Sequence, residues 1–444
     1  MNQNLFEIRN SEFEIMKKIL EIILAWLARR TLWKYKPKII AITGSVGKTS
    51  TKEAIFTVLK KKYRVRKSEG NLNTEIGLPL TILGAENPGR NIFGWLVVIT
   101  RAVRDLVKER NYPAILVLEY GIQQPRDMDV LTSIARPDIA VLTAIGEIPV
   151  HVEYFSSPES LVAEKLKLAR AVREGRTIIL NADDVRLSSA RESLPVPPLL
   201  FGFNADADMQ ITNLQLRFGK DAALGDVPDG MACKLEYNGS TVPVRLHHMF
   251  GIPQASAVAA AALVGVVLGM NLVEIADALG EYVSAPGRGR LILGIKHSFI
   301  LDDTYNASPE SMGAALDTLK NLPGKRKIAV LGDMLEIGGY TEEAHRMIGE
   351  LVAEFVELLL VVGTRARFIA DEALECGMPQ ERIFKFDDSR DAGHALDALI
   401  HEGDLILVKG SQGMRMEHVV LETMAHPEQA AKLLVRQESS WRKK

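Results

Sequence analysis

The sequence predicts an α/β protein with two main domains, the first combining a mainly parallel sheet with a small antiparallel sheet, the second containing another α/β sheet. Three observations support this fold class. Short apolar runs typical of strands alternate with helical segments along most of the chain. A glycine-rich loop follows the first of these runs, at residues 43–50. A Gly- and Pro-rich stretch, VSAPGRGR at residues 283–290, then separates two series of alternating elements.

The composition is that of an ordinary globular protein. With 444 residues the chain exceeds what one hydrophobic core usually serves, so two or three domains are expected. A net charge of -2 lacks the concentrated positive field of a nucleic-acid-binding protein. Cys233 and Cys376 are the only cysteines and lie far apart in sequence, which argues against a disulfide framework and a cysteine zinc site. A reducing cytoplasm is therefore the expected location.

The amino-terminal stretch FEIMKKILEIILAWLARRTLWKYKPK mixes apolar and basic residues. Its densest apolar run, Ile19–Ala28, contains Glu21 and is about half the length of a membrane-spanning helix. One interpretation is an amphipathic helix that contacts a membrane surface through residues 13–35, with Trp26 and Trp33 at the interface. The other is a helix packed on the protein's own core, where apolar helix faces are usually buried.

The first domain is expected to cover residues 38–284, after an amino-terminal helix and linker at 1–37. Strand and helix patterns alternate first, and polar–apolar alternation around Gly and Asn turns then predicts the antiparallel strands. The expected strands are KIIAIT (38–43), AILVLEYG (114–121), PDIAVLTAIG (137–146), GRTIILNADD (175–184), MQITNLQLRF (209–218), MACKLEYNGS (231–240) and TVPVRLHH (241–248). The segment 48–62 predicts a helix, and the wholly apolar segment 255–269 predicts a buried one.

The second domain is expected at residues 285–444. Its strand patterns are SFILDD (298–303), KIAVLGD (327–333), ELLLVVG (357–363) and DLILVKG (404–410). The helical segment SPESMGAALDTLK (308–320) follows the first of these strands. This alternation predicts a second sheet with helices packed against it.

The loop TGSVGKTS is a contracted phosphate-binding loop, Gly-x-x-Gly-Lys-Thr, between a strand and a helix. Its glycines allow backbone N–H groups to approach phosphate oxygens at the helix N-terminus. The lysine would reach the terminal phosphates, and the threonine hydroxyl would bind Mg²⁺. The residues expected to bind the nucleotide here are Gly44, Ser45, Val46, Gly47, Lys48, Thr49 and Ser50.

Three further polar residues are candidates whose roles spacing alone does not decide. Glu119 ends a predicted parallel strand, where its carboxylate should lie near the loop and suit Mg²⁺. His151 lies in the predicted loop VHVEYFSS, and Lys165 lies on the predicted helix after it. A loop histidine is more often structural than a ligand, and a helical lysine is usually solvated, so both interpretations stay open on spacing.

Taken together, the motifs resemble those of the Mur ligase family. They occur in the family's order: TGSVGKTSTKE, NLNTEIGLPLTIL, LEYG, VHVEYFSS, APGRGR, DDTYNASPESM, LGDMLEIG and LVKGSQGMRME. The resemblance covers about residues 38–430 and implies a P-loop ATPase domain followed by a Rossmann-like domain. It also implies an ATP-dependent amide ligase that forms an acyl phosphate. Three of these motifs are most similar to those of family members that join D-alanyl-D-alanine to a UDP-N-acetylmuramoyl-tripeptide in peptidoglycan synthesis.

The resemblance assigns roles in charge neutralisation at the phosphates. It implies that Lys48 and an Mg²⁺ ion held by Thr49 and Glu119 neutralise the β and γ phosphates. His151 would contribute to a second Mg²⁺. Lys165 matches the family's carbamylated lysine, in which a cation becomes an anionic oxygen ligand for metal.

The resemblance also supplies the remaining ATP contacts. Asn73 matches a residue near the γ phosphate, and Asn306 matches one that hydrogen-bonds adenine. Asp303 and Arg288 are expected near the ribose and phosphates, with Arg288 stabilising charge during transfer. The segment Lys409–Glu417 resembles the family's terminal motif.

The sequence departs from the family pattern at two places. Pro253, Gln254 and Ala257 stand where most relatives have a His-Asn pair and a further Asn, so an ATP contact is expected to be shifted. The usual amino-terminal uridine-binding domain is expected to be missing, since about 37 residues precede the first strand. The alternatives are therefore a ligase of the same superfamily with another carboxylate and amine, and a non-catalytic ATP-binding scaffold. A monomer that binds no nucleic acid is expected.

Overall fold

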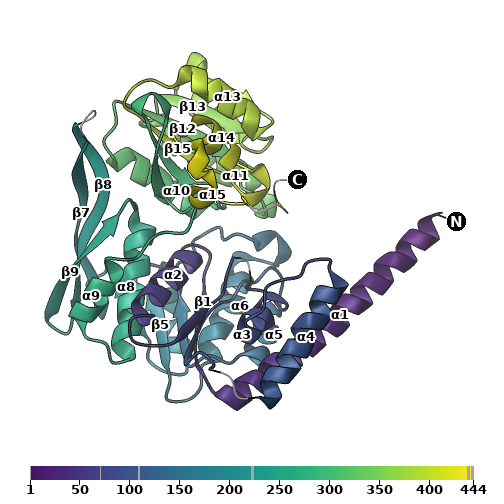
Figure 1. Cartoon of the computed structure of the whole chain (residues 1–444). Coiled ribbons are helices and arrows are strands. Elements are labelled where there is room, and N and C mark those ends of the chain that lie inside the picture. The colour runs from purple at the N-terminus through teal and green to yellow at the C-terminus, as the bar shows by residue number, and fades with distance from the viewer. Residues whose placement is uncertain (1, 71, 109–110, 222–224, 438–440, 442–444) are drawn as a thin grey trace.

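The structure, a computed structural model, describes residues 2–70, 72–108, 111–221, 225–437 and 441, with side chains described from Ile15 onward except at 221–226. Figure 1 shows two sheets with helices packed around them, and a long amino-terminal helix that extends past the lower part. This arrangement confirms the predicted α/β class. The division at residue 284 into two domains remains a prediction.

The first sheet has nine strands in the order β2-β3-β1-β4-β5-β6-β7-β8-β9. The six strands from β2 to β6 pair in parallel, and β7 to β9 form antiparallel pairs. The strands are β1 Lys38–Thr43, β2 Val65–Lys67, β3 Ile115–Glu119, β4 Ile139–Leu142, β5 Thr177–Asn181, β6 Leu199–Gly202, β7 Met209–Asp221, β8 Gly225–Tyr237 and β9 Ser240–His247.

The sequence predicted a small antiparallel sheet beside the parallel one. In the structure the antiparallel strands belong to the same nine-stranded sheet. Phe201 of β6 pairs in parallel with Met209 of β7, so the hairpin strands continue the nine-stranded sheet. Pairing across this junction satisfies backbone groups that would otherwise form an exposed edge on each side. The short strands β2 and β6 were not predicted, because three or four residues carry little periodic signal.

The helices around this sheet are α1 Asn2–Tyr35, α2 Lys48–Leu59, α3 Gly77–Leu83, α4 Ile92–Val107, α5 Asp127–Ile134, α6 Pro158–Arg170, α7 Val185–Ala190, α8 Ile252–Val267 and α9 Leu272–Leu279. The predicted buried helix is α8, which packs against α2, α9 and strands β5 to β7. Its small apolar residues from Ala257 to Gly265 are all buried. Their small size lets α8 lie close to α2, the helix that follows the phosphate-binding loop.

The second sheet has six strands in the order β10-β11-β15-β12-β13-β14, parallel except for the β10–β11 pair. Its strands are β10 Arg290–Leu293, β11 Phe299–Asp303, β12 Arg326–Gly332, β13 Leu358–Val362, β14 Ile383–Phe386 and β15 Asp404–Lys409. The helices are α10 Pro309–Asn321, α11 Thr341–Ala353, α12 Arg367–Glu375, α13 Ser389–Leu399, α14 Glu417–Thr423 and α15 Ala430–Leu433. The sequence did not predict β10 and β14.

The helix α1 packs on the protein through its second half. Leu24, Leu27 and Ala28 are buried against α3 and α4, and Arg29 donates to the Ser133 carbonyl at the end of α5. Packing on the protein's own core is therefore the observed arrangement of this part of the helix. Within the described residues, none of the helices has the length and apolar character needed to cross a membrane.

Candidate active site between the two sheets

The phosphate-binding loop connects β1 to α2 in the geometry that its glycines require. Gly47 adopts a left-handed φ of 87° at the start of α2. A side chain at Gly44 would collide with the Thr143 hydroxyl, because its Cβ would lie 1.9 Å from that oxygen. These two positions therefore need glycine for backbone conformation and for close packing, respectively. The first N–H groups of α2 have no partner within the helix and point toward the loop, where an anion would be favoured.

Two of the expected nucleotide contacts have a different role in the structure. The backbone N–H groups of Ser45 and Val46 both donate to the Ala144 carbonyl, at 2.7 and 3.1 Å. These amides therefore hold the loop on the segment after β4. The Ser45 hydroxyl, in contrast, is buried without a hydrogen-bond partner among the described residues. A buried polar atom of this kind normally has a partner, so this hydroxyl suits a ligand oxygen.

Lys48 lies in the loop with its ammonium group turned toward the site. Its Nζ donates to the carbonyls of Gly44 and Ser45, at 2.8 and 3.2 Å. Burial lowers the pKa of Lys48, an effect that Glu119 partly opposes. A nearby phosphate would therefore stabilise the charged form of this buried amine more strongly than that of an exposed lysine.

Glu119 and Thr49 form a suitable pair of oxygen ligands for Mg²⁺. Glu119 Oε2 lies 3.2 Å from Thr49 Oγ1, and Asn73 Nδ2 donates to Oε1 at 3.4 Å. Burial alone would raise the pKa of Glu119, but the cations of Lys52 and Lys48 outweigh burial and hold this pKa below its usual value. The carboxylate is therefore ionised, as an Mg²⁺ ligand must be.

Lys165 projects from α6 into the same site. Its side chain is 3% exposed, and its Nζ donates to the Gly44 carbonyl at 3.0 Å. Burial, with Lys48 nearby, holds the pKa of Lys165 well below its usual value. Burial therefore favours the neutral amine, which is the form that can attack carbon dioxide to form a carbamate. The structure thus fits the expected modification on chemical grounds.

His151 lies in the loop after β4 and contacts the second sheet's side of the site. Its Nδ1 is 2.7 Å from Glu336 Oε2, and its backbone N–H donates to the Glu336 carbonyl at 2.9 Å. Both residues have left-handed backbones, with φ of 73° and 64°. Such conformations are uncommon outside glycine and concentrate at functional sites. The contact links the predicted loop VHVEYFSS to the motif LGDMLEIG.

Arg288 reaches the phosphate-binding loop from the boundary stretch. Its guanidinium donates to Thr49 Oγ1 at 3.3 Å and lies 3.9 Å from the centre of the Tyr305 ring. Its Nε is buried without a hydrogen-bond partner among the described residues. Because stacking leaves the guanidinium donors free at its edges, Arg288 can still bind an anion.

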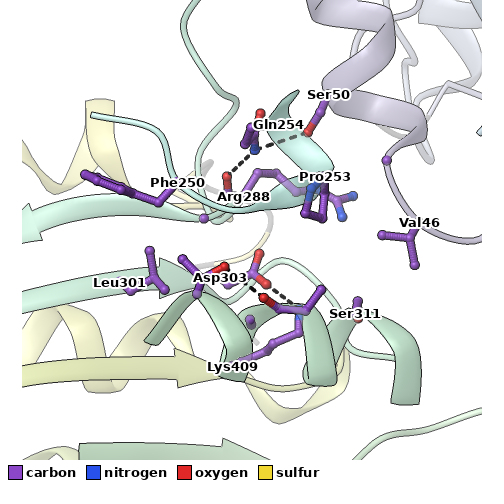
Figure 2. A pocket seen from close by; sticks show the side chains of 15 residues that line it. Val46, Ser50, Phe250, Pro253, Gln254, Arg288, Leu301, Asp303, Ser311 and Lys409 are labelled. Carbon is purple, nitrogen blue, oxygen red and sulfur yellow. Dashed lines mark hydrogen bonds and ion pairs between the residues drawn. The ribbon is translucent and has the colours of Figure 1, made fainter. Parts of the chain in front are cut away.

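Gln254 has no free amide to offer a nucleotide. Figure 2 shows its amide between α2 and the boundary stretch, with dashed contacts to Ser50 and Arg288. Its Nε2 donates to the Arg288 carbonyl at 2.7 Å, and its Oε1 accepts from the Tyr282 hydroxyl at 2.9 Å. This departure from the family pattern therefore positions the backbone of Arg288.

Asp303 ends β11 and Asn306 follows it, and the Lys409 ammonium contacts both, through Asp303 Oδ2 and the Asn306 carbonyl. Asp303 Oδ2 lies 2.5 Å from Lys409 Nζ, and both line a small cavity of about 60 Å³ with Val46 and Gln254 (Figure 2). The Asn306 side chain instead accepts from the Gln412 N–H at 3.3 Å.

The larger cavity, about 280 Å³, gathers most of the predicted residues. Its lining includes Gly44, Ser45, Val46, Lys48, Asn73, Glu119, His151, Lys165, Arg288 and Asn306. The first eight of these residues, up to Lys165, come from the strands, helices and loops of the first sheet. Arg288 lies in the boundary stretch, and Asn306 follows it. Asn306 therefore lies in the cavity that holds Lys48 and Lys165, whereas Asp303 lies in the smaller one.

Sequence analysis missed several residues of this site. Lys52, one turn after Lys48 in α2, is 1% exposed and lies 3.4 Å from Glu119 Oε2. The Tyr305 ring stacks on Arg288, and Glu336 contacts His151. Only Lys52 had a usable sequence signal, since residues four apart share a helix face. The other two depend on contacts between distant segments.

Comparisons with known proteins agree with this geometry. Residues 42–262 match the Mur ligase middle domain, and residues 287–412 match the Mur ligase, glutamate ligase domain. A Bacillus subtilis UDP-N-acetylmuramoyl-tripeptide--D-alanyl-D-alanine ligase is 30% identical over 407 residues, which cover 91% of this chain and 79% of that protein. The chain belongs to the Mur ligase family.

Solved structures of Mur ligases share the fold. The MurF ligase from Thermotoga maritima in complex with ADP is 27% identical, with a TM-score of 0.72 over 90% of this chain and 83% of that one. MurF from Acinetobacter baumannii is 25% identical, with a TM-score of 0.74 over 90% of this chain and 80% of that one. As a Mur ligase, the chain is an ATP-dependent ligase, which excludes the non-catalytic scaffold.

Proposed function

We propose that this Mur ligase joins D-alanyl-D-alanine to UDP-N-acetylmuramoyl-tripeptide, with ATP and Mg²⁺, in peptidoglycan precursor synthesis. The relatives named above support this substrate pair, because they carry that activity in their names and match most of the chain. The observation that carries the proposal is the larger cavity. Lys48 of the phosphate-binding loop, the Glu119 carboxylate and the buried Lys165 all line this one space.

The residues divide the work of phosphoryl transfer. Lys48 and Arg288 would hold the phosphates and offset the negative charge that a substrate carboxylate brings toward them. Thr49 and Glu119 would hold Mg²⁺, which supplies charge neutralisation at the β and γ phosphates. The carboxylate oxygen attacks the γ phosphorus, and ADP leaves. The amine nitrogen of the second substrate then attacks the carbonyl carbon, phosphate leaves, and the amine gives up a proton.

Lys165 and His151 would serve a second metal position. The carbamate of Lys165 would add an anionic oxygen close to Gly44, and His151, which lines the same cavity, would add a nitrogen. Asn73 would lie near the γ phosphate, since it already contacts Glu119. The adenine contact of Asn306 and the ribose contact of Asp303 stay predictions. The two residues line different cavities, so one nucleotide that meets both must extend from one cavity to the other.

A single chain would contain the complete ATP site. Both walls come from this chain, through Lys48 and Lys165 on one side and Asn306 and Gln412 on the other. We therefore propose a monomer as the active form. Both cysteines are free, which suits a reducing cytoplasm, where ATP is also available.

A ligation assay tests the proposal. Purified protein is incubated with ATP, Mg²⁺, D-alanyl-D-alanine and UDP-N-acetylmuramoyl-tripeptide, and the products are measured by mass spectrometry together with phosphate release. Release of ADP and phosphate should require both substrates and should accompany formation of the pentapeptide. Acceptors without the uridine diphosphate and a panel of other amines are run in parallel. Ligation of a different pair, with none of the pentapeptide, would replace the proposed substrates with another Mur-type pair.

A further inference from the structure

The helix α1 has a second apolar face, on the side away from the protein. Its buried side consists of Leu24, Leu27, Ala28 and Thr31. The exposed apolar residues on the opposite side are Ile15, Ile19, Ile22, Trp26 and Trp33, of which Ile22 is 69% and Trp33 is 74% exposed; Met16 and Ile23 are also exposed and lie beside this group. A helix that only packs on its own core would present polar residues on this side. We therefore infer that a binding partner covers the second apolar face.

The spacing of these residues places them on one line along the helix. Successive members from Ile15 to Trp33 are three, four or seven residues apart, which is the repeat of one helix face. At 3.6 residues per turn, this line lies roughly opposite the line through Leu24 and Leu27. In Figure 1 the amino-terminal part of α1 extends beyond the rest of its lobe.

The neighbouring helix α4 also carries exposed apolar side chains. It packs on α1 through Val98 and Ala102, while Phe93 and Val97 are 80% and 62% exposed. The Lys34 ammonium donates to the Leu106 carbonyl and so joins the carboxyl ends of the two helices. Exposed apolar residues on two packed helices exceed the scattered single residues that ordinary surfaces carry.

Basic residues border this apolar surface. Lys18, Arg29 and Arg30 flank the line on α1, and the Arg30 guanidinium lies 5.4 Å from the Trp26 ring centre. Glu21 is paired with Lys17, at 3.7 Å. A positive border is unexpected in a chain whose net charge is -2. Apolar residues and tryptophans bordered by cations match the chemistry of an anionic lipid surface, with acyl chains below negative headgroups.

We propose that the exposed faces of α1 and α4 bind peripherally to an anionic lipid bilayer. Ile22, Trp26 and Trp33 enter the boundary between headgroups and acyl chains, and Lys18 and Arg30 contact the phosphates. A second copy of the chain fits this surface less well. Two such helices packed face to face would bring the flanking cations of both chains together, where like charges repel. A lipid surface supplies the opposite charge.

Vesicle co-sedimentation of the full chain tests this. We expect binding to phosphatidylcholine vesicles that contain about one quarter phosphatidylglycerol to exceed binding to pure phosphatidylcholine by about tenfold, and to weaken as salt is raised. The double variant Ile22→Glu with Trp33→Glu should lower binding by about tenfold or more, since both new carboxylates face the lipid phosphates. Lys18→Gln with Arg30→Gln should remove the preference for the anionic vesicles.

A matched control distinguishes this surface from general hydrophobicity. Val273 of α9 is 63% exposed, on a helix that packs against β9 and α2, so Val273→Glu should leave vesicle binding unchanged. ATP hydrolysis and the melting temperature of each variant are measured alongside to confirm folding. Equal binding by the parent and the Ile22/Trp33 variant would overturn the proposal. So would a parent that ignores vesicles but forms a dimer in light scattering that the same variant dissociates, because the occupant would then be a second copy.

Discussion

Lys165 shows how burial prepares one side chain for chemistry. Its amine is enclosed by α6 and the phosphate-binding loop and has the Gly44 carbonyl as its acceptor. In water a lysine is mostly protonated at neutral pH, and the protonated form does not react with carbon dioxide. Burial and Lys48 lower the pKa of Lys165 and so favour the nucleophilic neutral amine, close to the proposed metal position.

Replacing Lys165 should abolish ligation and leave the fold intact. We expect Lys165→Ala to lower the ligation rate by about a hundredfold or more, since even outer-shell partners of a metal contribute up to that factor. Lys167, two residues on in α6, is half-buried and pairs with Asp129 at the surface, so Lys167→Ala is the matched control. Protein loaded with carbon-13 bicarbonate should give a carbamate signal in the parent and in Lys167→Ala, and none in Lys165→Ala. Full activity in Lys165→Ala would refute the metal role.

At the scale of elements, α8 and α11 each carry one buried polar side chain that fixes a loop of the site. Gln254, at the start of α8, is tied to the backbone of Arg288. His345, on α11, is fully buried beneath the motif LGDMLEIG. Its Nε2 accepts from the Met334 N–H at 3.0 Å, and its Nδ1 lies 2.6 Å from the Thr341 carbonyl. These two contacts require a neutral ring with its proton on Nδ1.

Gln254 should contribute to stability through its two partners. In Gln254→Leu, the Arg288 carbonyl and the Tyr282 hydroxyl each lose one hydrogen bond and keep another, to Ser284 Oγ and to the Ser50 carbonyl, respectively. We expect a loss of about 2 kcal/mol in the free energy of unfolding, because two buried hydrogen bonds of about 1 kcal/mol each are removed. Denaturant titration measures this loss. Ser256→Ala, on the same helix, should cost less than half as much, and an equal cost for both would show that the amide contacts contribute little.

The buried histidine should make stability depend on pH. Burial lowers the pKa of His345 below its usual value of 6.5. The unfolded chain therefore binds a proton that the folded chain does not, as the pH falls through 6.5 toward the lowered value. Stability should drop in that window by up to about 1.4 kcal/mol per pH unit, and it should be fully present above it. The difference between the free energies of unfolding of the parent and of His345→Gln, measured at pH values from about 5 to 8, should show this slope.

Sequence patterns predicted the local parts of this site and missed the parts made by tertiary contacts. Lys48 and Thr49 follow β1, and Glu119 ends β3. A parallel sheet brings such strand ends together, so the proximity of these residues was predictable. Glu336 lies far from His151 in sequence. Its left-handed backbone conformation could not be predicted, because the position is not a glycine. The hydrogen bonds of Gln254 to Arg288 and Tyr282 could not be predicted either, because residue type alone does not tell which partners a side-chain amide has.

At the scale of the whole molecule, the ATP site joins two sheets that share one cluster of buried apolar residues, which includes Ile40 of β1 and Leu301 of β11. Polar and close-packed contacts also cross the junction, including His151 with Glu336 and the close approach of Glu153 to Gly338. The Cβ that any other residue would carry at Gly338 would lie 2.8 Å from the Glu153 Cβ. A ligand that contacts both walls of the cavity should therefore stabilise the molecule as a unit.

ATP should stabilise the folded chain through Lys48. At a concentration of about one hundred times its dissociation constant, ATP with Mg²⁺ should add about 2.7 kcal/mol to the free energy of unfolding. Lys48→Ala should show little stabilisation at the same concentration, whereas Lys60→Ala, at the exposed end of the same helix, should behave like the parent. Thermal unfolding with and without ATP measures this. Equal stabilisation of all three proteins would place the nucleotide elsewhere.

The two hydrogen bonds that Ala144 accepts from Ser45 and Val46 give the molecule a short mechanical linkage. The same segment runs on to His151, which is fastened to Glu336 on the other side of the junction. We therefore expect a displacement of the phosphate-binding loop to be felt along this stretch of backbone at the second sheet. Filling of the nucleotide site and docking of the two sheets would then be coupled through a path that involves no phosphate contact.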